Sequence, residues 1–362
     1  MQTALLDTYH TRLGAGPRSW LCWTVSAALF ASYLLLYFGP MPALGLRRDV
    51  LATAAVALGF SSKWTLYGSV YTLAMVLGGW YFLRRHGNSR YHRWRTLSVV
   101  GVQCLLAFAL PLVMRVLTGH EYYLSYFWPL KIEYLYPDVI LEYPFLLVAY
   151  SFVGSLIAFP LLAYFFGKRF YCSWVCGCGG MANTAGEPWR HLSNKSVRAW
   201  HVEQWSIYSV LGVAVFTTLV VWLNWSIGAA HPHMARFAFA LQDGYAFVVG
   251  AMFAGVLGVG LYPLMGTRVW CRFACPMAAL LGLVQRFGQF RITVKPDMCI
   301  ACGNCSTYCE MGIDVRVYAM ANEDVRRAAC VGCGMCAHVC PRGVLKLENK
   351  TEPWRLGHQV NA

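Results

Sequence analysis

Charged residues are scarce in this sequence, and their scarcity limits the kind of protein it can encode. Only 13% of the 362 residues are Asp, Glu, Lys or Arg, whereas 58% are hydrophobic. The hydrophobic residues also gather in long runs, and a helix needs about 20 apolar residues to cross a bilayer. The composition therefore excludes an ordinary soluble protein and indicates an integral membrane protein.

Several cofactor motifs are missing as well. The sequence has no C-x-x-C-H, which excludes covalently attached c-type haem, and no G-x-G-x-x-G to open a nucleotide-binding βαβ unit. We expect no pair of histidines within facing membrane helices, which argues against b-type haem. A nicotinamide or FAD site would have to lie on another subunit.

Six hydrophobic stretches are long enough to span a membrane. They cover residues 20–38, 64–83, 96–117, 144–166, 205–228 and 245–265. The first stretch lacks a small-residue cleavage site at its end, which is typical of a retained anchor. A shorter stretch at 50–60 is expected at the interface or in a buried turn.

Lys and Arg are distributed unevenly between the connecting segments. Segments 84–95, 167–204 and 266–298 each carry five, whereas segments 39–63, 118–143 and 229–244 carry three, one and one. By the positive-inside rule, both termini and the C-terminal segment are expected on the cytoplasmic side of a bacterial inner membrane. The net charge of +14 therefore reflects topology and predicts no nucleic-acid partner.

The cysteine motifs of residues 299–341 carry the strongest functional signal. The spacing C-x2-C-x2-C-x3-C occurs twice, and Pro341 follows the second copy. In bacterial two-cluster ferredoxins the last Cys of each run ligates the other cluster. We therefore predict two [4Fe–4S] clusters, one on Cys299, Cys302, Cys305 and Cys340, the other on Cys330, Cys333, Cys336 and Cys309. A pair of zinc sites is the alternative, but zinc sites rarely show three Cys at this spacing twice.

An internal repeat supplies a second group of thiols. Residues 167–177 read GKRFYCSWVCG and residues 266–276 read GTRVWCRFACP, and the four-residue Cys spacing predicts both sulfurs on one face of a helical turn. The repeat predicts a shared iron–sulfur cluster or metal on Cys172, Cys176, Cys271 and Cys275. Cys178 is an extra candidate. A redox-active disulfide, disfavoured in a reducing cytoplasm, and purely structural thiols are the alternatives.

A quinol site would need groups that accept protons on the opposite side. The segment 118–143 offers His120, Glu121 and Glu133 among many aromatic residues, which we expect mostly in the interfacial belt. The segment 229–244 offers His231, His233 and Asp243. These residues are candidates for a quinone site, with ordinary solvated loop residues as the alternative.

The predicted fold class is a membrane all-α protein with six transmembrane helices, plus a small C-terminal ferredoxin-like α+β domain with two clusters. We expect a cytoplasmic leader at 1–19 and a membrane domain at 20–289 that contains the repeat. A dicluster ferredoxin-like domain follows at 290–348, and a tail at 349–362.

From about residue 60 to residue 345 the chain resembles the NapH/NosR-type polyferredoxin membrane proteins. The resemblance implies electron transfer between the quinol pool and partner redox proteins. The chain departs from the family pattern at Gly177, which stands where C-x3-C-P has Pro, and at Glu310, which follows Cys309 where ferredoxins usually have Pro. Residues 312–316 (GIDVR) are similar to CcoG-type proteins, which are linked to copper reduction during oxidase assembly.

Two main hypotheses follow. The first is an electron-transfer subunit of a quinol-linked oxidoreductase complex, which uses the two clusters and the four membrane-side thiols to reach a redox partner protein or subunit. The second is an assembly or metal-reduction factor, because thiolates suit Cu(I). A redox sensor is a third possibility without a sequence feature of its own.

Overall fold

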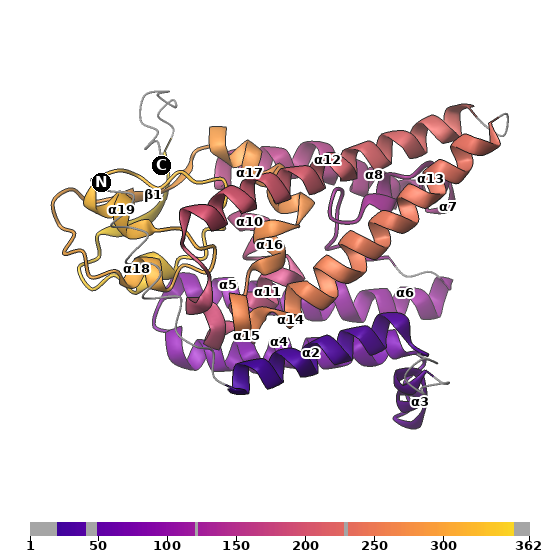
Figure 1. Cartoon of the computed structure of the whole chain (residues 1–362), viewed down its shortest axis with the longest axis horizontal. Helices are drawn as coiled ribbons and strands as arrows, with labels where there is room; N and C mark the ends of the chain where they lie inside the picture. Colours follow the sequence, from indigo (N-terminus) through magenta and orange to yellow (C-terminus); the bar gives the residue numbers. More distant parts are fainter. Residues whose placement is uncertain (1–19, 41–48, 120–121, 228–230, 351–362) are drawn as a thin grey trace.

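The computed structural model describes residues 20–40, 49–119, 122–227 and 231–350. The predicted leader at 1–19 and most of the predicted tail lie outside these residues. Figure 1 shows an elongated arrangement in which the long helices follow the long axis. The C-terminal strand β1 and the short helices α18 and α19 lie at one end, and helix α3 lies at the other.

The prediction of six hydrophobic spans is confirmed: six helices in the described part of the chain are long and apolar enough to cross a membrane. Three are single helices, α2 (Trp20–Phe38), α4 (Lys63–His86) and α12 (Val197–Ile227). The other three contain a π-helical segment between α-helical parts. They are α5 (Arg90–Val102) with η2 (Gln103–Ala109) and α6 (Leu110–Thr118), α8 (Phe145–Val153) with η4 (Gly154–Ala158) and α9 (Phe159–Phe166), and α13 (Pro232–Tyr245) with η7 (Ala246–Leu257) and α14 (Gly258–Gly260).

The bounds of several spans differ from those predicted, because helices continue beyond their apolar stretches. The fifth begins at Val197, and the sixth covers Pro232–Gly260 where 245–265 was predicted. Pro232 occupies the first turn of α13, where its fixed φ suits a helix start. Helix α4 ends with Arg84, Arg85 and His86, and the positive charge of the two arginines favours a helix C-terminus.

Large apolar side chains on the spans face outward. Val116, Phe145 and Trp205 are each about 80% exposed. Such surfaces are unfavourable in water and favourable in the hydrocarbon core of a bilayer. The exposed apolar faces therefore fit a multi-pass membrane protein.

The segment between α6 and α8 does not form the interfacial belt that was predicted. It contains η3 (Ile132–Leu135) and α7 (Pro137–Glu142), and its aromatic residues Tyr122, Phe127, Tyr134 and Tyr136 are at least 93% buried. The prediction was wrong for these four side chains, because the segment folds inward. The Tyr171 hydroxyl donates to the carbonyl oxygen of Ser125 over 2.9 Å, so the segment reaches the first copy of the repeat.

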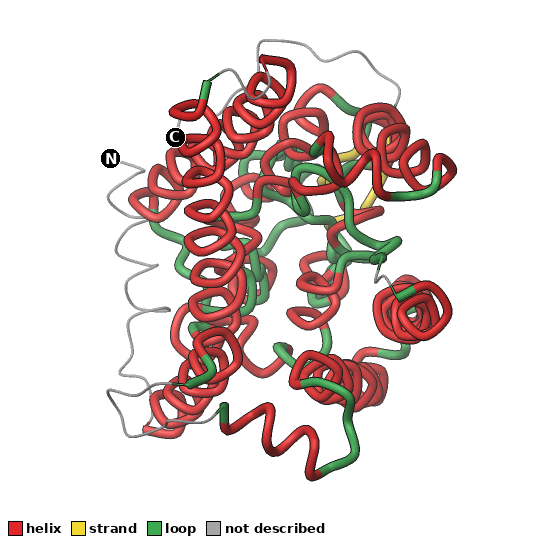
Figure 2. The backbone as a smooth tube through the Cα atoms, turned by 90° about the vertical axis from the view of Figure 1, so that its right-hand side faces the viewer, coloured by secondary structure: helices red, strands yellow, loops and turns green. Residues whose placement is uncertain are grey.

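Short helices and turns fill the space between the spans. Figure 2 views the bundle from the end remote from the strands and shows short helices and loops enclosed by the longer helices. The short helices are α3 (Val50–Ala57), α10 (Arg169–Cys172), α11 (Gly177–Asn183), η5 (Glu187–Leu192), α15 (Tyr262–Met265), α16 (Val269–Phe273) and α17 (Pro276–Phe287). Helix α17 packs against α9 and α12, and it is a buried connector between the sixth span and strand β1.

The C-terminal segment folds around a two-stranded antiparallel sheet. Strand β1 (Phe290–Val294) pairs with β2 (Leu345–Asn349), and between them lie α18 (Asn304–Thr307), α19 (Val315–Met320) and α20 (Met335–His338). Backbone conformation repeats at an offset of 31 residues. Positive φ occurs in the pairs Ala301 and Gly332 (55° and 57°), Gly303 and Gly334 (79° and 82°), and Gly312 and Gly343 (68° and 60°).

We predict that Gly167 and Gly266, the first residues of the two repeat copies, do not tolerate alanine. Their φ angles are 70° and 92°, and an added Cβ would lie 2.6 Å from the Phe290 ring or 2.5 Å from the Ser193 hydroxyl. Left-handed backbone costs an L-residue about 1–2 kcal/mol, and the contacts add to that cost. Gly167→Ala and Gly266→Ala should each shorten the thermal inactivation half-life of the protein in detergent. Gly212→Ala in α12 is the control, because its Cβ would meet nothing within 4 Å; an equal loss there would contradict the prediction.

Candidate functional site

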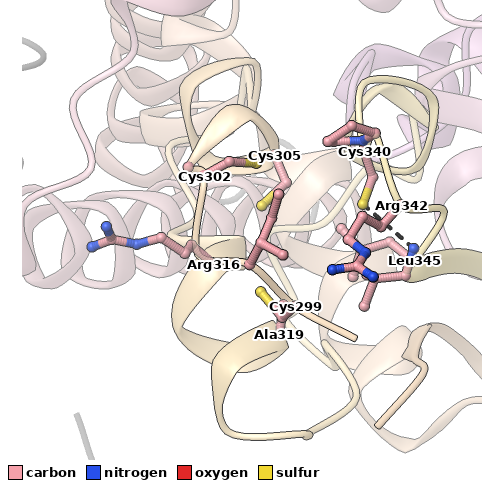
Figure 3. A pocket seen from close by; sticks show the side chains of 12 residues that line it. Cys299, Cys302, Cys305, Arg316, Ala319, Cys340, Arg342 and Leu345 are labelled. Carbon is pink, nitrogen blue, oxygen red and sulfur yellow. Dashed lines mark hydrogen bonds between the residues drawn. The ribbon is translucent and has the colours of Figure 1, made fainter. Parts of the chain in front are cut away.

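The first predicted cluster site is a pocket in the C-terminal segment. Cys299, Cys302, Cys305 and Cys340 line it together with Arg316 and Arg342, and Figure 3 shows the four thiols around the pocket. The backbone N–H of Val344 donates to the Cys340 sulfur over 3.4 Å. The structure thus brings together the four cysteines that the ferredoxin spacing assigns to one cluster, and their thiol chemistry fits an iron–sulfur cube.

The second predicted cluster site comprises Cys309, Cys330, Cys333 and Cys336. The pKa of Cys330 is raised to about 12 and that of Cys309 to about 11. Burial is the largest cause of both increases, and neighbouring thiols contribute to them. A bound metal cluster would reverse this preference, because coordination deprotonates a thiol. Backbone N–H groups of Gly332 and Met335 point at the sulfurs of Cys330 and Cys333. Such hydrogen bonds tune cluster potentials, so this donor set also fits an iron–sulfur cube.

The two repeat copies have the same local geometry, but it differs from the helical turn that was predicted. Cys172 ends α10 and Cys176 precedes α11, while Cys271 lies in α16 and Cys275 precedes α17. The amide of Cys176 donates to Tyr171 over 2.8 Å, and the amide of Cys275 donates to Trp270 over 2.9 Å. Each Cys pair therefore flanks a tight turn between two short helices.

The four cysteines of the repeat, Cys172, Cys176, Cys271 and Cys275, are called the membrane-side thiols below. All four are buried. Burial raises the pKa of Cys172 to about 12, and its neighbours Cys176 and Cys271 contribute to the increase. The pKa of Cys275 is raised well above its usual range, first by burial and then by the charges of the other three thiols. The two copies thus place their thiols at one shared, water-poor location.

Cys178 lies beside this group without a counterpart in the second copy. A hydrogen bond from its thiol lowers the pKa of Cys176 below its usual range, and Cys178 also interacts with Cys271 and Cys275. In the described part of the chain, no three His, Cys, Asp or Glu side chains converge as the ligands of a single metal ion would.

The structure explains why Gly177 stands where the family pattern has Pro. A Cβ at this position would lie 2.5 Å from the Tyr71 hydroxyl and 2.6 Å from the Gln103 side-chain oxygen. The Gln103 amide also donates to the carbonyl oxygen of Val175 over 2.7 Å. The third span therefore packs directly on the first Cys turn and leaves no room for a larger residue.

The second cluster site is bound to the membrane domain through four consecutive carbonyl groups. Each carbonyl from Cys330 to Cys333 accepts a hydrogen bond from a side chain that lies before the C-terminal segment. The donors, in order, are Gln285 (2.9 Å), Ser173 (2.7 Å), Tyr91 (2.7 Å) and Arg95 (2.6 Å). Ser173 directly follows the membrane-side thiol Cys172, so the two sulfur sites are in direct contact through their loops.

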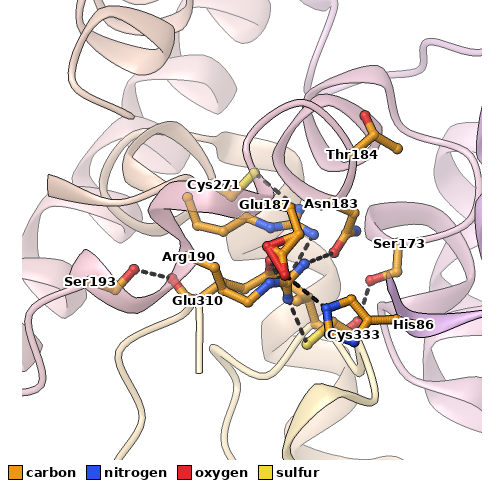
Figure 4. A network of polar contacts seen from close by, with 12 residues as sticks. His86, Ser173, Asn183, Thr184, Glu187, Arg190, Ser193, Cys271, Glu310 and Cys333 are labelled. Carbon is orange, nitrogen blue, oxygen red and sulfur yellow. Dashed lines mark hydrogen bonds and ion pairs between the residues drawn. The ribbon is translucent and has the colours of Figure 1, made fainter. Parts of the chain in front are cut away.

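A buried ion triad forms a second link between the two sites. Glu310 is fully buried and binds Arg268 over 2.8 Å and Arg190 over 2.9 Å. Arg268 contacts the sulfur of Cys271 at 3.7 Å, and Arg190 contacts the sulfur of Cys333 at 3.9 Å, as Figure 4 shows. Burial alone would raise the pKa of Glu310, but Arg190 and Arg268 hold it at about 2, so the carboxylate is ionised.

The structure also gathers three histidines that the sequence did not connect. The rings of His86 and His92 lie 4.9–5.3 Å from that of His338, and His86 and His92 belong to the second and third spans. The expectation that facing spans carry no histidine pair was therefore wrong. His86 forms a 2.9 Å hydrogen bond with Glu187. The sequence gave no signal of their contact, because His338 is far from His86 and His92 in the chain.

Four of the six candidate quinone residues, Glu133, His231, His233 and Asp243, lie in the described part of the chain. His120 and Glu121 lie outside the described residues. Glu133 is half exposed and pairs with Lys131. His233 and Asp243 are exposed within α13 and are therefore helical residues, contrary to the predicted loop.

Comparison with known families agrees with the location of the cysteine motifs. Residues 298–345 match the 4Fe–4S dicluster domain. Residues 148–196 and 246–295 each match a 4Fe–4S binding domain, and each of these stretches contains one copy of the repeat. The chain therefore carries ferredoxin-type 4Fe–4S domains in both its C-terminal segment and its membrane domain.

Among curated proteins, the chain is similar to the methylamine utilization ferredoxin-type protein MauN of Paracoccus denitrificans, with 28% identity over 46% of this chain and 60% of MauN. It is also similar to the putative electron transport protein YccM of Escherichia coli, with 27% identity over 44% of this chain and 46% of YccM. The match thus spans about half the length of these relatives. No solved structure matches the chain. The chain is homologous to the MauN and YccM ferredoxin-type proteins.

We predict that Glu310→Ala destabilises the protein strongly. The substitution leaves Arg190 and Arg268 buried without their carboxylate, and breaking such a buried pair costs about 3–5 kcal/mol. The inactivation half-life in detergent should fall accordingly. Glu133→Ala is the matched control, since its pair with Lys131 is 33% to 52% exposed and exposed pairs contribute about 0–1 kcal/mol. Similar half-lives for the two variants would refute the structural role of Glu310.

Proposed function

We propose that the protein is a membrane electron-transfer subunit that passes electrons between the quinol pool and a redox partner protein. Its two ferredoxin-type sites each hold a [4Fe–4S] cluster, and the membrane-side thiols hold a further iron–sulfur cluster. An iron–sulfur cluster accepts and donates one electron at a time. The observation that carries the proposal is the contact between Ser173, beside a membrane-side thiol, and the carbonyl of Val331 in the second cluster site.

The role of the polypeptide in this function is to position the clusters and set their potentials. Buried thiols exclude water, and backbone N–H groups such as that of Ala278, 3.4 Å from the Cys275 sulfur, favour the reduced cluster. The two matches to a 4Fe–4S binding domain over the repeat support a cluster at the membrane-side thiols. The resemblance to NapH/NosR-type proteins is part of this proposal.

The inward fold of residues 122–136 supports a quinol-linked function. Trp128 donates to Thr218 in α12 over 3.0 Å. Tyr171, which directly precedes Cys172, donates its hydroxyl to the carbonyl oxygen of Ser125 in this segment. The segment thus connects the end of the bundle remote from the ferredoxin-type sites with the membrane-side thiols. Glu133, His233 and Asp243 remain candidates for the proton-accepting groups of a quinol site at that end.

The competing function is reduction or delivery of a metal such as copper. Four buried thiols suit Cu(I), and residues 312–316 are similar to those of CcoG-type proteins. In that function the thiols would bind copper as substrate, and the two ferredoxin-type clusters would supply the electrons.

Iron and acid-labile sulfide per polypeptide distinguish the two functions. We expect clearly more than about eight irons in anaerobically purified protein, because two ferredoxin-type cubes account for about eight. Cys172→Ser and Cys271→Ser should lower the count to about eight and remove one EPR signal of the reduced protein. Cys178→Ser should leave the count unchanged, since Cys178 has no counterpart in the second repeat copy.

A count of about eight in the unmodified protein would contradict a cluster at the membrane-side thiols. Titration with Cu(I) would then be the next measurement, and stoichiometric copper binding lost in Cys172→Ser would establish the competing function.

The proposed orientation places the ferredoxin-type sites in the bacterial cytoplasm. In Figure 1 the α4–α5 connection, α10 and α17, which belong to the three most basic segments, lie toward the end that carries β1. A C-terminal green fluorescent protein fusion should therefore fluoresce, and a C-terminal alkaline phosphatase fusion should be inactive. The reverse pattern would overturn the orientation. The proposal includes a leader at 1–19, a membrane domain at 20–289, a dicluster ferredoxin-like domain at 290–348 and a tail at 349–362.

A further inference from the structure

The two ferredoxin-type sites are alike in sequence but differ in their surroundings. The loop from Cys330 to Cys333 in the second site has all four carbonyls bonded by side chains of the membrane domain. The equivalent loop from Cys299 to Cys302 in the first site faces outward, with Ile300 53% exposed. Cys302 is exposed, whereas its equivalent Cys333 is partly buried, and Cys299 is partly buried, whereas its equivalent Cys330 is buried.

The 31-residue offset allows the two loops to be compared position by position. At Gly332 an added Cβ would lie 2.7 Å from the Cβ of Arg169 and 2.9 Å from the Phe290 ring. The equivalent residue in the first site is Ala301, which carries a Cβ at a similar φ of 55° and is exposed. At this position the second site packs against Arg169 and Phe290, whereas the first site is exposed.

The residue that follows the last Cys of each run shows the same difference. Glu310 is fully buried and binds two arginines, while its equivalent, Pro341, is exposed and lines the pocket of the first site. Through Glu310, Arg268 at the Cys271 sulfur is connected to Arg190 at the Cys333 sulfur.

We propose that the two clusters act in a fixed order. The cluster of Cys309, Cys330, Cys333 and Cys336 exchanges electrons with the membrane-side thiol site, and the cluster of Cys299, Cys302, Cys305 and Cys340 exchanges electrons with the soluble redox partner. This order rests on the proposed electron-transfer function. Each passage moves one electron from centre to centre without making or breaking a covalent bond, and the quinol and the partner protein are its two terminal reactants.

Arg190 is a positioning residue for this order. Its guanidinium contacts the sulfur of Cys333 in the second ferredoxin-type site. A positive charge there stabilises the more negative, reduced form of the cluster. Arg342 lies at the pocket of the first ferredoxin-type site, formed by Cys299, Cys302, Cys305 and Cys340. Its side chain is exposed, so solvent and salt screen its charge.

The test uses redox titration of the anaerobically purified full-length protein followed by EPR. Arg190→Gln should lower the reduction equilibrium constant of one ferredoxin-type cluster at least tenfold, which is about 59 mV for one electron. That cluster's EPR relaxation should be insensitive to dysprosium–EDTA added to the solution, because the cluster is enclosed. The signal that does respond to dysprosium–EDTA should keep its potential in this variant.

Two further variants complete the test. Arg190→Lys keeps the charge and should restore most of the potential, which a merely structural role would not predict. Arg342→Gln should shift only the dysprosium-sensitive signal, and by less. The order is overturned if Arg190→Gln shifts the dysprosium-sensitive cluster or neither cluster.

The test is independent of whether the membrane-side thiols hold iron. A total of about eight irons would refute the third cluster of the proposed function, yet the two ferredoxin-type signals would still report which of them is enclosed and which Arg190 affects.

Discussion

The contact between the loop of Cys330–Cys333 and the membrane domain is the interaction on which the rest of the arrangement depends. The Val331 carbonyl and the Gly332 N–H belong to the same peptide, so the hydrogen bond from Ser173 to this carbonyl also fixes the N–H that points at the Cys330 sulfur. Each such bond contributes roughly 0.5–1.5 kcal/mol, and more when the donor is charged, as Arg95 is. The four donors come from the third span, the first Cys turn and α17. The cluster loop can therefore form its native conformation only when these three elements are assembled.

The grouping of Cys299, Cys302, Cys305 and Cys340 could be predicted from the sequence because it depends largely on local spacing. Three cysteines at two-residue intervals define a loop whatever surrounds it, and apolar runs of about 20 residues define spans by length alone. The first predicted ligand set coincides with the pocket of Cys299, Cys302, Cys305 and Cys340. The ends of the spans were predicted less well, because polar residues continue the helices where tertiary contacts satisfy them.

The contacts that position the sites could not be predicted, because their partners are far apart in the chain. Tyr91 and Gly332 are separated by 241 residues, and Tyr91 belongs to no recognisable motif. The two departures from the family pattern, Gly177 and Glu310, were visible in the sequence but had no explanation there. The structure explains both: Gly177 makes room for Tyr71 and Gln103, and Glu310 forms ion pairs with two buried arginines.

Both internal repeats lose their symmetry at the surface where they meet. Ser173 binds the second cluster loop, whereas its equivalent Arg272 binds Glu203 of α12 over 2.6 Å. Arg169 lies against the strands, whereas its equivalent Arg268 binds Glu310. The residues that repeat are those that bear thiols or set turns, and the residues that differ are those that join one module to the other. Duplication thus accounts for the repeated cysteines and turns, and divergence at a few positions accounts for the fixed placement of the second ferredoxin-type site against the membrane-side thiols.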